Sequence, residues 1–355
     1  MKKIKIGIAG CGRVAQHYKL IFESGSINNY EIIAVCDKDK NKAEDFSKNF
    51  KCNFYEGLEE MIENNKPDLN LILTPSGEHY KDSKTSLTMG CHTIVEKPIT
   101  MLPSQAEELK KISVESKLMY GVVYQNRLNP AVQFLAKELD LNNFGKIITS
   151  SIRLRWSRKQ EYYQDEWHGK WSQDGGVINQ QAIHHIDIMN WLLGPITEVC
   201  AHGGNLVNKL EAEDTMVAIV KFKNGSFGTL EATTALRTKD YEASMSVVGD
   251  KGIATIGGVA LNKIENWIVP NSEEKEELIR KKYSQEVPSG YGLSHGPFLQ
   301  KIIDSLQNKK IDPPVSAEDG IKTSKIIHSL YASYEKNSWI KIKDNVQSEK
   351  LGIDK

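Results

Sequence analysis

The chain has 355 residues, of which 39% are hydrophobic and 26% are charged. This length exceeds what one ordinary hydrophobic core holds, and it predicts two domains. Forty-six basic and 46 acidic residues give a net charge of zero. This balance removes the electrostatic basis for nonspecific binding to nucleic acid or to an anionic membrane.

The N-terminal residues and the cysteines predict a soluble protein of the cytoplasm. Residues 1–8 alternate charged and apolar side chains, as a strand does, and they lack the apolar run of a signal peptide. The sequence contains no run of about 18 apolar residues, so we expect no membrane span. The five cysteines form no CxxC pair, and we expect them to be free thiols without bound metal.

In the first 125 residues, short apolar strands alternate with helical stretches. This alternation implies parallel strands joined by right-handed helical crossovers. We therefore expect a doubly wound parallel sheet in a first domain of residues 1–125. The predicted strands are 3–9, 30–36, 69–74, 92–95 and 119–124, and the predicted helices are 14–24, 40–50, 80–89 and 103–116.

After Pro130 long strands dominate, and Asn224-Gly225 is the turn signal of a hairpin between two of them. We expect a second domain of residues 126–343, in which a mostly antiparallel, open-faced sheet carries helices on one face. Its final helix is expected to pack back on the first domain, and residues 344–355 are expected to form a loose tail. The predicted strands are 146–156, 196–206, 215–222, 226–235, 241–249 and 252–256, with a helix at 182–193 and a charged helix or loop at 273–282.

A glycine-rich segment follows the first predicted strand directly and opens the first helix. Gly10 allows a tight turn, and Gly12 lets the backbone approach a pyrophosphate at the helix start. Asp37 ends the second strand about 25 residues later, where a carboxylate accepts hydrogen bonds from ribose hydroxyls. We expect NAD rather than NADP as the cofactor. The alternative interpretation of the glycine-rich segment is a turn that binds no ligand. The predicted cofactor contacts are Gly10, Gly12, Arg13, Val14 and Asp37.

Two loops at the ends of later strands complete the expected cofactor site, because ligands bind at the carboxyl ends of parallel strands. Residues 74–79 (TPSGEH) follow the third strand, and the alternative for them is a plain connecting turn. Residues 96–98 (EKP) end the fourth strand. A partly desolvated Lys97 can stay cationic and stabilise an alkoxide, whereas a solvated surface lysine is the alternative. The predicted contacts are Thr74, Pro75, Ser76, His79, Glu96 and Lys97.

Together these motifs resemble one family. A GxGxxA turn, an acid after the second strand, TPSGxH after the third strand and EKP after the fourth are similar to the Gfo/Idh/MocA oxidoreductases. The resemblance covers residues from about 1 to 335 and is specific as a set. It implies an N-terminal Rossmann domain and NAD-dependent oxidation of a sugar, a cyclitol or a nucleotide sugar.

The resemblance also implies a catalytic acid–base group. Residues 175–187 (GGVINQQAIHHID) match the family's GGxxxDxGxHxxD helix and place His184 at its catalytic histidine. A neutral imidazole is a suitable acceptor for a hydroxyl proton near pH 7. On a helix His185 points about 100° away, so only one of the two histidines faces the cofactor. The alternative is that both histidines are structural.

Gln180 departs from the family pattern, because many members carry an aspartate there. An amide here, in the run NQQAIH of residues 179–184, is similar to the branch that oxidises UDP-N-acetylglucosaminuronate at C3 and supplies the 3-keto sugar to a PLP-dependent aminotransferase. Arginine and lysine suit the carboxylate or the diphosphate of such a substrate, and solvated surface charge is the alternative for each. The expected substrate contacts are Arg127, Arg158, Lys170, Gln180, His184, Tyr291 and His295, and Gln125 is expected beside the cofactor.

The sequence thus predicts an NAD-dependent sugar dehydrogenase in the synthesis of surface-polysaccharide sugars. In this hypothesis His184 takes the proton from the C3 hydroxyl while C3 gives its hydride to NAD, and Lys97 stabilises the developing charge. The alternatives are a dehydrogenase of another sugar or of a cyclitol such as inositol, and a noncatalytic NAD-binding regulator. A flavin or metal enzyme is not favoured, because no cluster of ligands is visible in the sequence.

We expect the open face of the second domain's sheet to pair with another subunit. The strand at residues 215–222 is apolar enough for such pairing. The family resemblance likewise implies a homodimer or a homotetramer. The residues that make this pairing plausible are Val217, Ile219, Val220 and Phe222.

Overall fold

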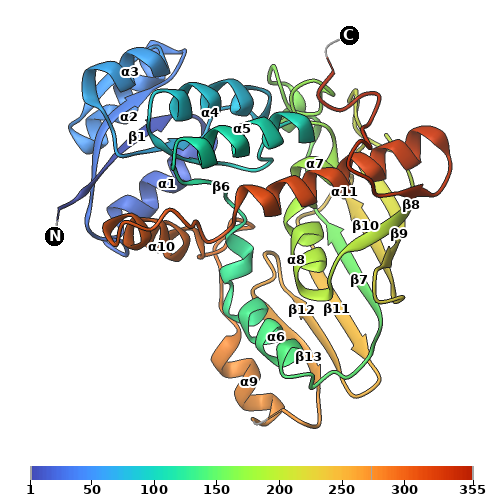
Figure 1. The fold of residues 1–355 in the computed structure, drawn as a ribbon. Coiled ribbons are helices and arrows are strands. Elements are labelled where there is room, and N and C mark those ends of the chain that lie inside the picture. The colour runs from blue at the N-terminus through green and yellow to red at the C-terminus, as the bar shows by residue number, and fades with distance from the viewer. Residues whose placement is uncertain (1, 273, 354–355) are drawn as a thin grey trace. The chain divides into compact units, whose positions relative to one another are not determined.

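The computed structural model describes residues 2–272 and 274–353, and it consists of two compact units (Figure 1). The first unit contains the residues up to Val123 together with 295–324, and the second contains 124–294 and the residues from 325 onward. This differs from the expected single boundary at 125/126. The backbone explains the difference, because Val122 N–H donates to Val315 O over 3.3 Å. The segment around Val315 therefore covers the edge of the first unit's sheet.

The first unit is built on a wholly parallel sheet, as predicted, with six strands where five were expected. Its strand order is β3-β2-β1-β4-β5-β6, so the chain reverses direction across the sheet between β1 and β4. Ligands bind at such a switch point, beyond the carboxyl ends of the strands. The strands are β1 (Ile4–Ala9), β2 (Tyr30–Cys36), β3 (Asn53–Tyr55), β4 (Leu69–Ile72), β5 (His92–Val95) and β6 (Tyr120–Val122).

Local sequence signals start and end the helices of the first unit. The Asp39 side chain caps α2 by accepting hydrogen bonds from Asn41 N–H and Lys42 N–H, and Lys51 ends that helix in the left-handed conformation. The fixed φ of Pro103 suits the first position of α5. The helices are α1 (Arg13–Glu23), α2 (Lys40–Phe50), α3 (Leu58–Asn65), α4 (His79–Thr88), α5 (Pro103–Glu115) and α10 (His295–Gln307).

The second unit is built on an eight-stranded sheet of order β13-β12-β11-β7-β10-β9-β8-β14, in which only β7 and β10 pair in parallel. Helices α6 (Pro130–Asp140), α8 (Ile183–Leu193) and the last part of α11 (Ala317–Lys336) cover one face (Figure 1). The predicted mostly antiparallel, open-faced sheet is therefore confirmed. The strands are β7 (Ile147–Arg155), β8 (Ile196–Gly204), β9 (Thr215–Phe222), β10 (Phe227–Thr233), β11 (Glu242–Gly249), β12 (Ile253–Gly257), β13 (Lys263–Ile268) and β14 (Ile340–Lys341).

Strand β9 shows how the two faces of this sheet differ. Val217 and Ile219 are 50% and 46% exposed, whereas Val220 and Phe222 are each 1% exposed beneath the helices. Side chains alternate between the faces of a strand, so these four residues cannot share one face. The assignment of Val220 and Phe222 to the open face was therefore wrong, and only Val217 and Ile219 belong to it.

The C-terminal segment is packed and not loose. Ser348 and Leu351 are 2% and 1% exposed. Ser348 N–H donates to His328 Nδ1 over 3.1 Å, and its hydroxyl donates to Glu335 Oε1 over 2.6 Å. The prediction of a loose tail was therefore wrong up to residue 353, because buried polar contacts to α11 hold the segment in place.

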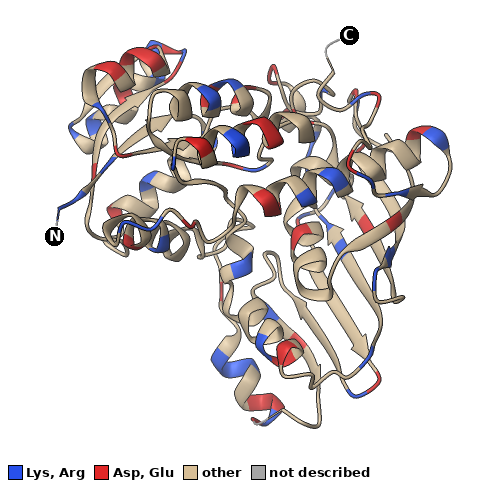
Figure 2. Cartoon of the chain, viewed as in Figure 1, with Lys and Arg blue, Asp and Glu red and all other residues tan. Residues whose placement is uncertain are grey.

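Basic and acidic residues are interspersed along the helices of both units (Figure 2). This distribution agrees with the net charge of zero. The charged segment predicted as a helix or loop contains α9 (Glu276–Tyr283), and residue 273 lies outside the described part. Among the helices that the structure describes, none is long and apolar enough to cross a membrane.

Candidate active site

The glycine turn after β1 can be formed only by glycine at its first position. Gly10 adopts a φ of 94°, and a Cβ there would lie 2.6 Å from the backbone carbon of Leu73. At Gly12, the N-cap of α1, an added Cβ would meet no described atom within 4 Å. The turn therefore presents backbone to open space at the start of an 11-residue helix. This is the arrangement that a pyrophosphate requires.

Asp37 is fixed beside this turn by two backbone donors. Its Oδ2 accepts a hydrogen bond from Cys11 N–H over 2.8 Å, and its Oδ1 accepts one from Asp39 N–H over 2.9 Å. A carboxylate offers about four acceptor positions, so Asp37 retains positions for ribose hydroxyls. Arg13 is exposed and Val14 half-buried in the first turn of α1. The predicted cofactor residues of this region therefore lie together.

His79 joins the two loops that follow β4 and β5. Its side chain is 1% exposed, with Nδ1 2.7 Å from Pro98 O and Nε2 2.9 Å from Thr74 O. Burial lowers the pKa of His79 to about 4, so the ring is neutral near pH 7 and donates to one carbonyl at a time. Thr74 Oγ1 donates to Asp82 over 2.7 Å, and burial raises the pKa of Asp82 to about 6. The same loop contains the other predicted residues, Pro75 and Ser76.

Glu96 and Lys97 follow β5 at the carboxyl edge of the sheet. The Glu96 carboxyl is buried, and it accepts hydrogen bonds from Tyr18 OH over 2.7 Å and from Lys97 N–H over 3.2 Å. Burial raises the pKa of Glu96, and the charge of Lys97 opposes this rise. Lys97 itself is only half-buried. Its position is compatible with the predicted role of a cation that meets a ligand.

His295 occupies a place that its sequence context does not reveal. It begins α10 in the first unit and is 3% exposed. Its Nε2 lies 3.8 Å from Glu96 Oε1, and its Nδ1 lies 3.3 Å from His17 Nε2. The sequence analysis expected His295 among the substrate contacts. The structure places it against the glutamate of the EKP segment.

The adjacent histidines of α8 have contrasting surroundings. His185 is 1% exposed, and burial lowers its pKa to about 4, so it is a neutral core residue. His184 is partly exposed, and its ring stands edge-on to Tyr124 with the centroids 5.8 Å apart. Of the two rings, His184 is the more exposed. Gln180 ends the preceding short helix α7 (Val177–Gln180) and is 7% exposed.

Arg127 is held by a bidentate ion pair with Asp187. Its Nε and Nη2 each donate to a carboxylate oxygen over 2.7 Å, and the side chains are 9% and 0% exposed. The guanidinium carbon also lies 5.1 Å from the Trp191 ring centroid. This pairing was not predicted, because residues 60 positions apart give no local sign of it. Gln125 lies two residues before Arg127, in the same short 3-10 helix, η2 (Gln125–Leu128).

Replacing Asp187 with alanine is expected to lower the free energy of unfolding by about 3 kcal/mol or more, because it leaves the Arg127 charge buried without its carboxylate. Urea denaturation measures this loss. The matched control is the double variant with Arg127→Met, which removes both charges and should recover much of the lost stability. If the single and double variants lose the same free energy of unfolding, the pairing of Arg127 with Asp187 contributes nothing to stability.

The remaining predicted substrate contacts lie outside helices and strands in the second unit. Arg158 Nη1 donates to Asp240 Oδ1 over 2.8 Å, and the guanidinium carbon lies 4.9 Å from the Trp156 ring centroid. Lys170 is partly exposed, and Tyr291 is 37% exposed. Arg158 therefore already has an anionic partner, whereas the other two side chains reach solvent.

Two matches to family models account for most of the chain. Residues 4–124 match the NAD-binding Rossmann fold of the Gfo/Idh/MocA oxidoreductase family, and residues 136–342 match the C-terminal alpha/beta domain of that family. The chain belongs to the Gfo/Idh/MocA oxidoreductase family. The family resemblance noted in the sequence is therefore confirmed, and so is the fold that it implied.

Comparisons over the whole chain agree with this assignment. The WlbA dehydrogenase from Chromobacterium violaceum, solved in complex with NADH and UDP-GlcNAcA, is 28% identical, has a TM-score of 0.90 and covers 97% of each chain. The Bordetella pertussis WlbA dehydrogenase, solved with the same ligands, is 27% identical with a TM-score of 0.90, covering 96% of this chain and 98% of its own. The D-glucoside 3-dehydrogenase of Escherichia coli is 22% identical over 358 residues, covering 96% of this chain and 97% of its own.

The protein is thus an NAD-dependent oxidoreductase of a family of sugar dehydrogenases, and the predicted cofactor is confirmed. The residues present fit that cofactor, because the open space at Gly12 admits a pyrophosphate and Asp37 retains acceptors for ribose hydroxyls. When bound, NAD supplies the acceptor for a hydride. In the part of the chain that the structure describes, no group of three His, Cys, Asp or Glu side chains could hold a metal ion.

The sequence analysis overlooked several buried groups of this Gfo/Idh/MocA member. Tyr18 and His17 lie on α1, where a helical pattern marks a buried face but not a hydrogen bond to Glu96. Glu213 and Tyr331 are likewise buried and bonded to each other over 3.0 Å. Nothing in the local sequence points to Glu213, because Glu211 and Asp214 beside it make the segment resemble a solvated acidic turn.

Proposed function

We propose that this protein oxidises the C3 hydroxyl of UDP-N-acetylglucosaminuronate to a 3-keto sugar, with NAD as oxidant, in the synthesis of surface-polysaccharide sugars. The observation that carries the proposal is the likeness to the WlbA dehydrogenase complexed with NADH and UDP-GlcNAcA, which extends over 97% of both chains at a TM-score of 0.90. A PLP-dependent aminotransferase that consumes the 3-keto product is the proposed pathway partner. The five free cysteines suit a cytoplasmic enzyme.

The chemistry assigns one task to each of two residues. His184 accepts the proton of the C3 hydroxyl, and NAD, when bound, would supply the acceptor for the hydride that leaves C3, so that the C–O single bond becomes a carbonyl. The Lys97 ammonium stabilises the negative charge that develops on the oxygen. The neutral neighbour His185 is buried in the core, and it takes no part in this transfer.

Gln180 supports a uronate substrate. Its side chain is 7% exposed at the end of α7, shortly before His184. A carboxylate at this position would repel a carboxylate on the sugar, whereas an amide brings no charge and can donate a hydrogen bond. Lys170 is the preferred anchor for an anionic group, since Arg158 is already paired with Asp240. Arg127 acts as a support for α8 through Asp187.

A second candidate is the oxidation of a neutral glucoside or a cyclitol. The likeness to D-glucoside 3-dehydrogenase favours it, because that match covers 96% of this chain. A noncatalytic NAD-binding regulator is disfavoured, because a sensor would need neither Lys97 nor His184. The two enzyme candidates differ in the charge of the substrate and not in the acid–base chemistry.

A substrate panel separates these candidates. NADH absorbance is followed with UDP-N-acetylglucosaminuronate, UDP-N-acetylglucosamine, a methyl glucoside and myo-inositol, each with and without 2-oxoglutarate and the aminotransferase. We expect turnover with the uronate and much less with UDP-N-acetylglucosamine, which differs only in lacking the carboxylate. Turnover with the glucoside or inositol alone would replace the proposal by the second candidate.

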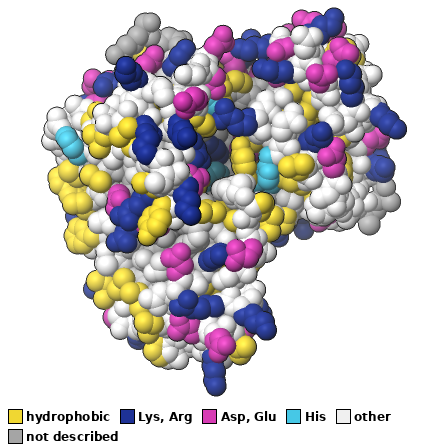
Figure 3. Space-filling model, turned by 180° about the vertical axis from the view of Figure 1, so that it is seen from behind, with side chains coloured by type: hydrophobic (Ala, Val, Ile, Leu, Met, Phe, Trp, Pro, Cys, Tyr) yellow, Lys and Arg dark blue, Asp and Glu magenta, His cyan; other side chains and the backbone are white. Residues whose placement is uncertain are grey.

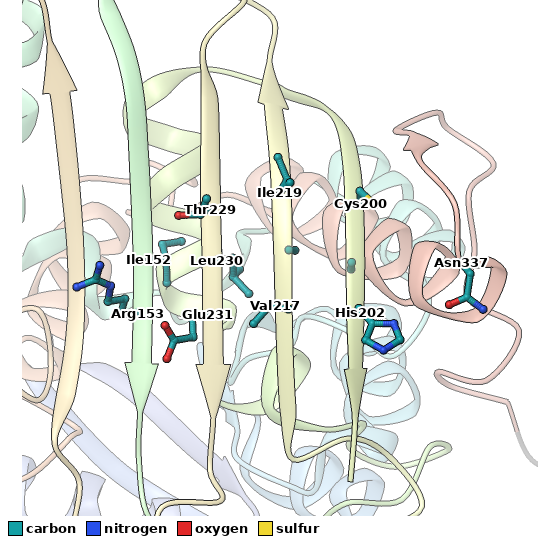
Figure 4. A pocket seen from close by; sticks show the side chains of 12 residues that line it. Ile152, Arg153, Cys200, His202, Val217, Ile219, Thr229, Leu230, Glu231 and Asn337 are labelled. Atoms are coloured by element: carbon teal, nitrogen blue, oxygen red, sulfur yellow. The ribbon is translucent and has the colours of Figure 1, made fainter. Parts of the chain in front are cut away.

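The open face of the second unit's sheet is proposed to pair with a second copy of the chain. Val217, Ile219 and Phe227 are 50%, 46% and 51% exposed there, and a shallow pocket runs across β7, β10, β9 and β8 (Figure 4). Seen from behind, hydrophobic side chains gather in patches over this part of the molecule (Figure 3). Arg155 on the same face is paired with Glu231 over 2.7 Å. An apolar surface with paired charges suits a self-complementary interface.

Val217→Glu is expected to convert a dimer or tetramer into smaller species, because it would bury a charge in that interface. Sedimentation at micromolar concentration measures the change. Val114→Glu on α5 is the matched control, since this valine is 66% exposed in the first unit. A wild-type chain that sediments as a monomer would contradict the proposed pairing.

A further inference from the structure

A buried carboxyl lies at the base of the segment that carries Gln180 and His184. Glu213 precedes β9 and is 1% exposed. Its Oε1 accepts hydrogen bonds from Ile178 N–H and from Tyr331 OH, each over 3.0 Å, and its backbone oxygen accepts one from Val177 N–H over 3.1 Å. Its Oε2 is buried and has no hydrogen-bond partner among the described residues.

The glycine turn before α7 is shaped around this carboxyl. A Cβ at Gly176 would lie 2.1 Å from the Glu213 backbone oxygen and 2.2 Å from Oε2, so only glycine fits there. Gly176 N–H donates to Tyr331 OH over 3.0 Å, and that hydroxyl donates to Glu213. The turn, the tyrosine and the carboxyl therefore form one closed hydrogen-bonded set.

The next residue, Asp214, shows by contrast what Glu213 lacks. The Asp214 carboxyl accepts hydrogen bonds from Leu206 N–H, Val207 N–H and Asn208 N–H over 2.9, 3.0 and 2.8 Å. It also accepts one from the hydroxyl of Thr215 over 3.0 Å. The Glu213 carboxyl accepts hydrogen bonds from Ile178 N–H and Tyr331 OH, and the charge of Asp214 opposes its ionisation.

The groups that face the Glu213 carboxyl explain its protonation state. Helix α7 contributes only backbone N–H groups, α11 contributes the neutral Tyr331 hydroxyl, and its own segment contributes Asp214. Burial raises the pKa of Glu213 to about 7, and the charge of Asp214 adds to the rise. The free Oε2 is the natural position of the proton, because both donors bind Oε1.

We propose that Glu213 is a positioning residue whose protonated carboxyl holds the glycine turn and α7 in place, so that ionisation loosens the segment carrying Gln180 and His184. The inference rests on the proposed function, in which His184 receives the substrate proton. Helix α7 begins at Val177, directly on the contacts to Glu213, and α8 with His184 follows after two residues. A shift of α7 is therefore passed to the acid–base group.

The sign of the pH effect follows from the direction of the shift. The pKa of Glu213 is higher in the folded protein than that of an exposed glutamate. The stability that its proton contributes is therefore fully present near about pH 4 and is lost as the pH rises through about 7. Local opening of residues 175–182 becomes easier over the same range.

Hydrogen exchange of the intact protein tests this without substrate. Amide exchange of residues 175–182 is compared in wild type and Glu213→Gln, which keeps an acceptor oxygen but cannot ionise. We expect the ratio of wild-type to variant exchange rates to rise by on the order of tenfold to a hundredfold between about pH 5 and pH 8. Glu211→Gln, an exposed acid in the same segment, is the matched control and should give a constant ratio.

Two further readouts complete the test. If Glu213→Gln does not fold, Tyr331→Phe serves instead and should raise exchange in residues 175–182 by several-fold at about pH 6. The alkaline decline of wild-type kcat should also move by at least about one pH unit in Glu213→Gln. A ratio that does not vary with pH overturns the inference. If no substrate of the panel turns over but the exchange ratio still rises with pH, the proposed function is wrong and the role of Glu213 stands.

Discussion

Replacing Lys97 with methionine is expected to lower kcat by at least about a hundredfold, the scale of a positioned group that meets charge in the transition state. Methionine keeps much of the apolar stem of lysine and removes the ammonium. Lys97 is half-buried at the end of β5, and its backbone N–H is bonded to the buried Glu96. The loop should therefore keep its shape in the variant, and the loss should lie in kcat.

Steady-state kinetics and NAD binding by calorimetry measure this prediction together. NAD affinity should change by less than about tenfold, because the turn at Gly12 and the acid at Asp37 are untouched. Lys81→Met on α4 is the matched control, since this lysine is exposed and lies just after the loop of residues 74–79. Near-normal turnover in Lys97→Met would remove the lysine from the mechanism while leaving the fold and the cofactor assignment intact.

Replacing His184 with glutamine is expected to reduce kcat by about a hundredfold to ten-thousandfold, because glutamine cannot take up the hydroxyl proton. The side chain is partly exposed, so the melting temperature should change little. His185→Gln provides a matched control on the same helix. It replaces a residue that is 1% exposed, and it should lower the melting temperature while the folded fraction keeps its turnover.

The two histidine variants therefore predict opposite patterns. Thermal denaturation and kcat are measured on both proteins under the same conditions. Loss of turnover in His185→Gln with normal turnover in His184→Gln would reverse the assignment of the acid–base residue. Normal turnover in both variants would contradict the proposed role of His184 and would favour a different base.

Local patterns account for much of what the sequence predicted. The strands Tyr30–Cys36, His92–Val95 and Thr215–Phe222 were predicted to the residue, because each is a short apolar run bounded by polar turns. The turn at Gly10 was also predicted, since a tight turn between a strand and a helix needs a backbone that only glycine adopts easily. The strand β3 was missed, because Asn53–Tyr55 is short and exposed on one side.

Long-range pairings could not be predicted from one sequence. The ion pair of Arg127 with Asp187 and the contact of His295 with Glu96 each join residues far apart in the chain. The same holds for the return of residues 295–324 to the first unit, which depends on which sheet edge accepts the segment. Sequence periodicity indicates which side of a helix or strand is buried, but it does not indicate which residues that side contacts.

The proposed function requires that C3 of the nucleotide sugar gives its hydride to NAD. The most direct test uses UDP-N-acetylglucosaminuronate carrying deuterium at C3, with the NADH and the sugar product analysed by mass spectrometry after one turnover. We predict NADH carrying the deuterium and a 3-keto sugar without it. Unlabelled NADH would show oxidation at another carbon, and no NADH from this sugar, with turnover of a neutral glucoside instead, would contradict the nucleotide-sugar assignment.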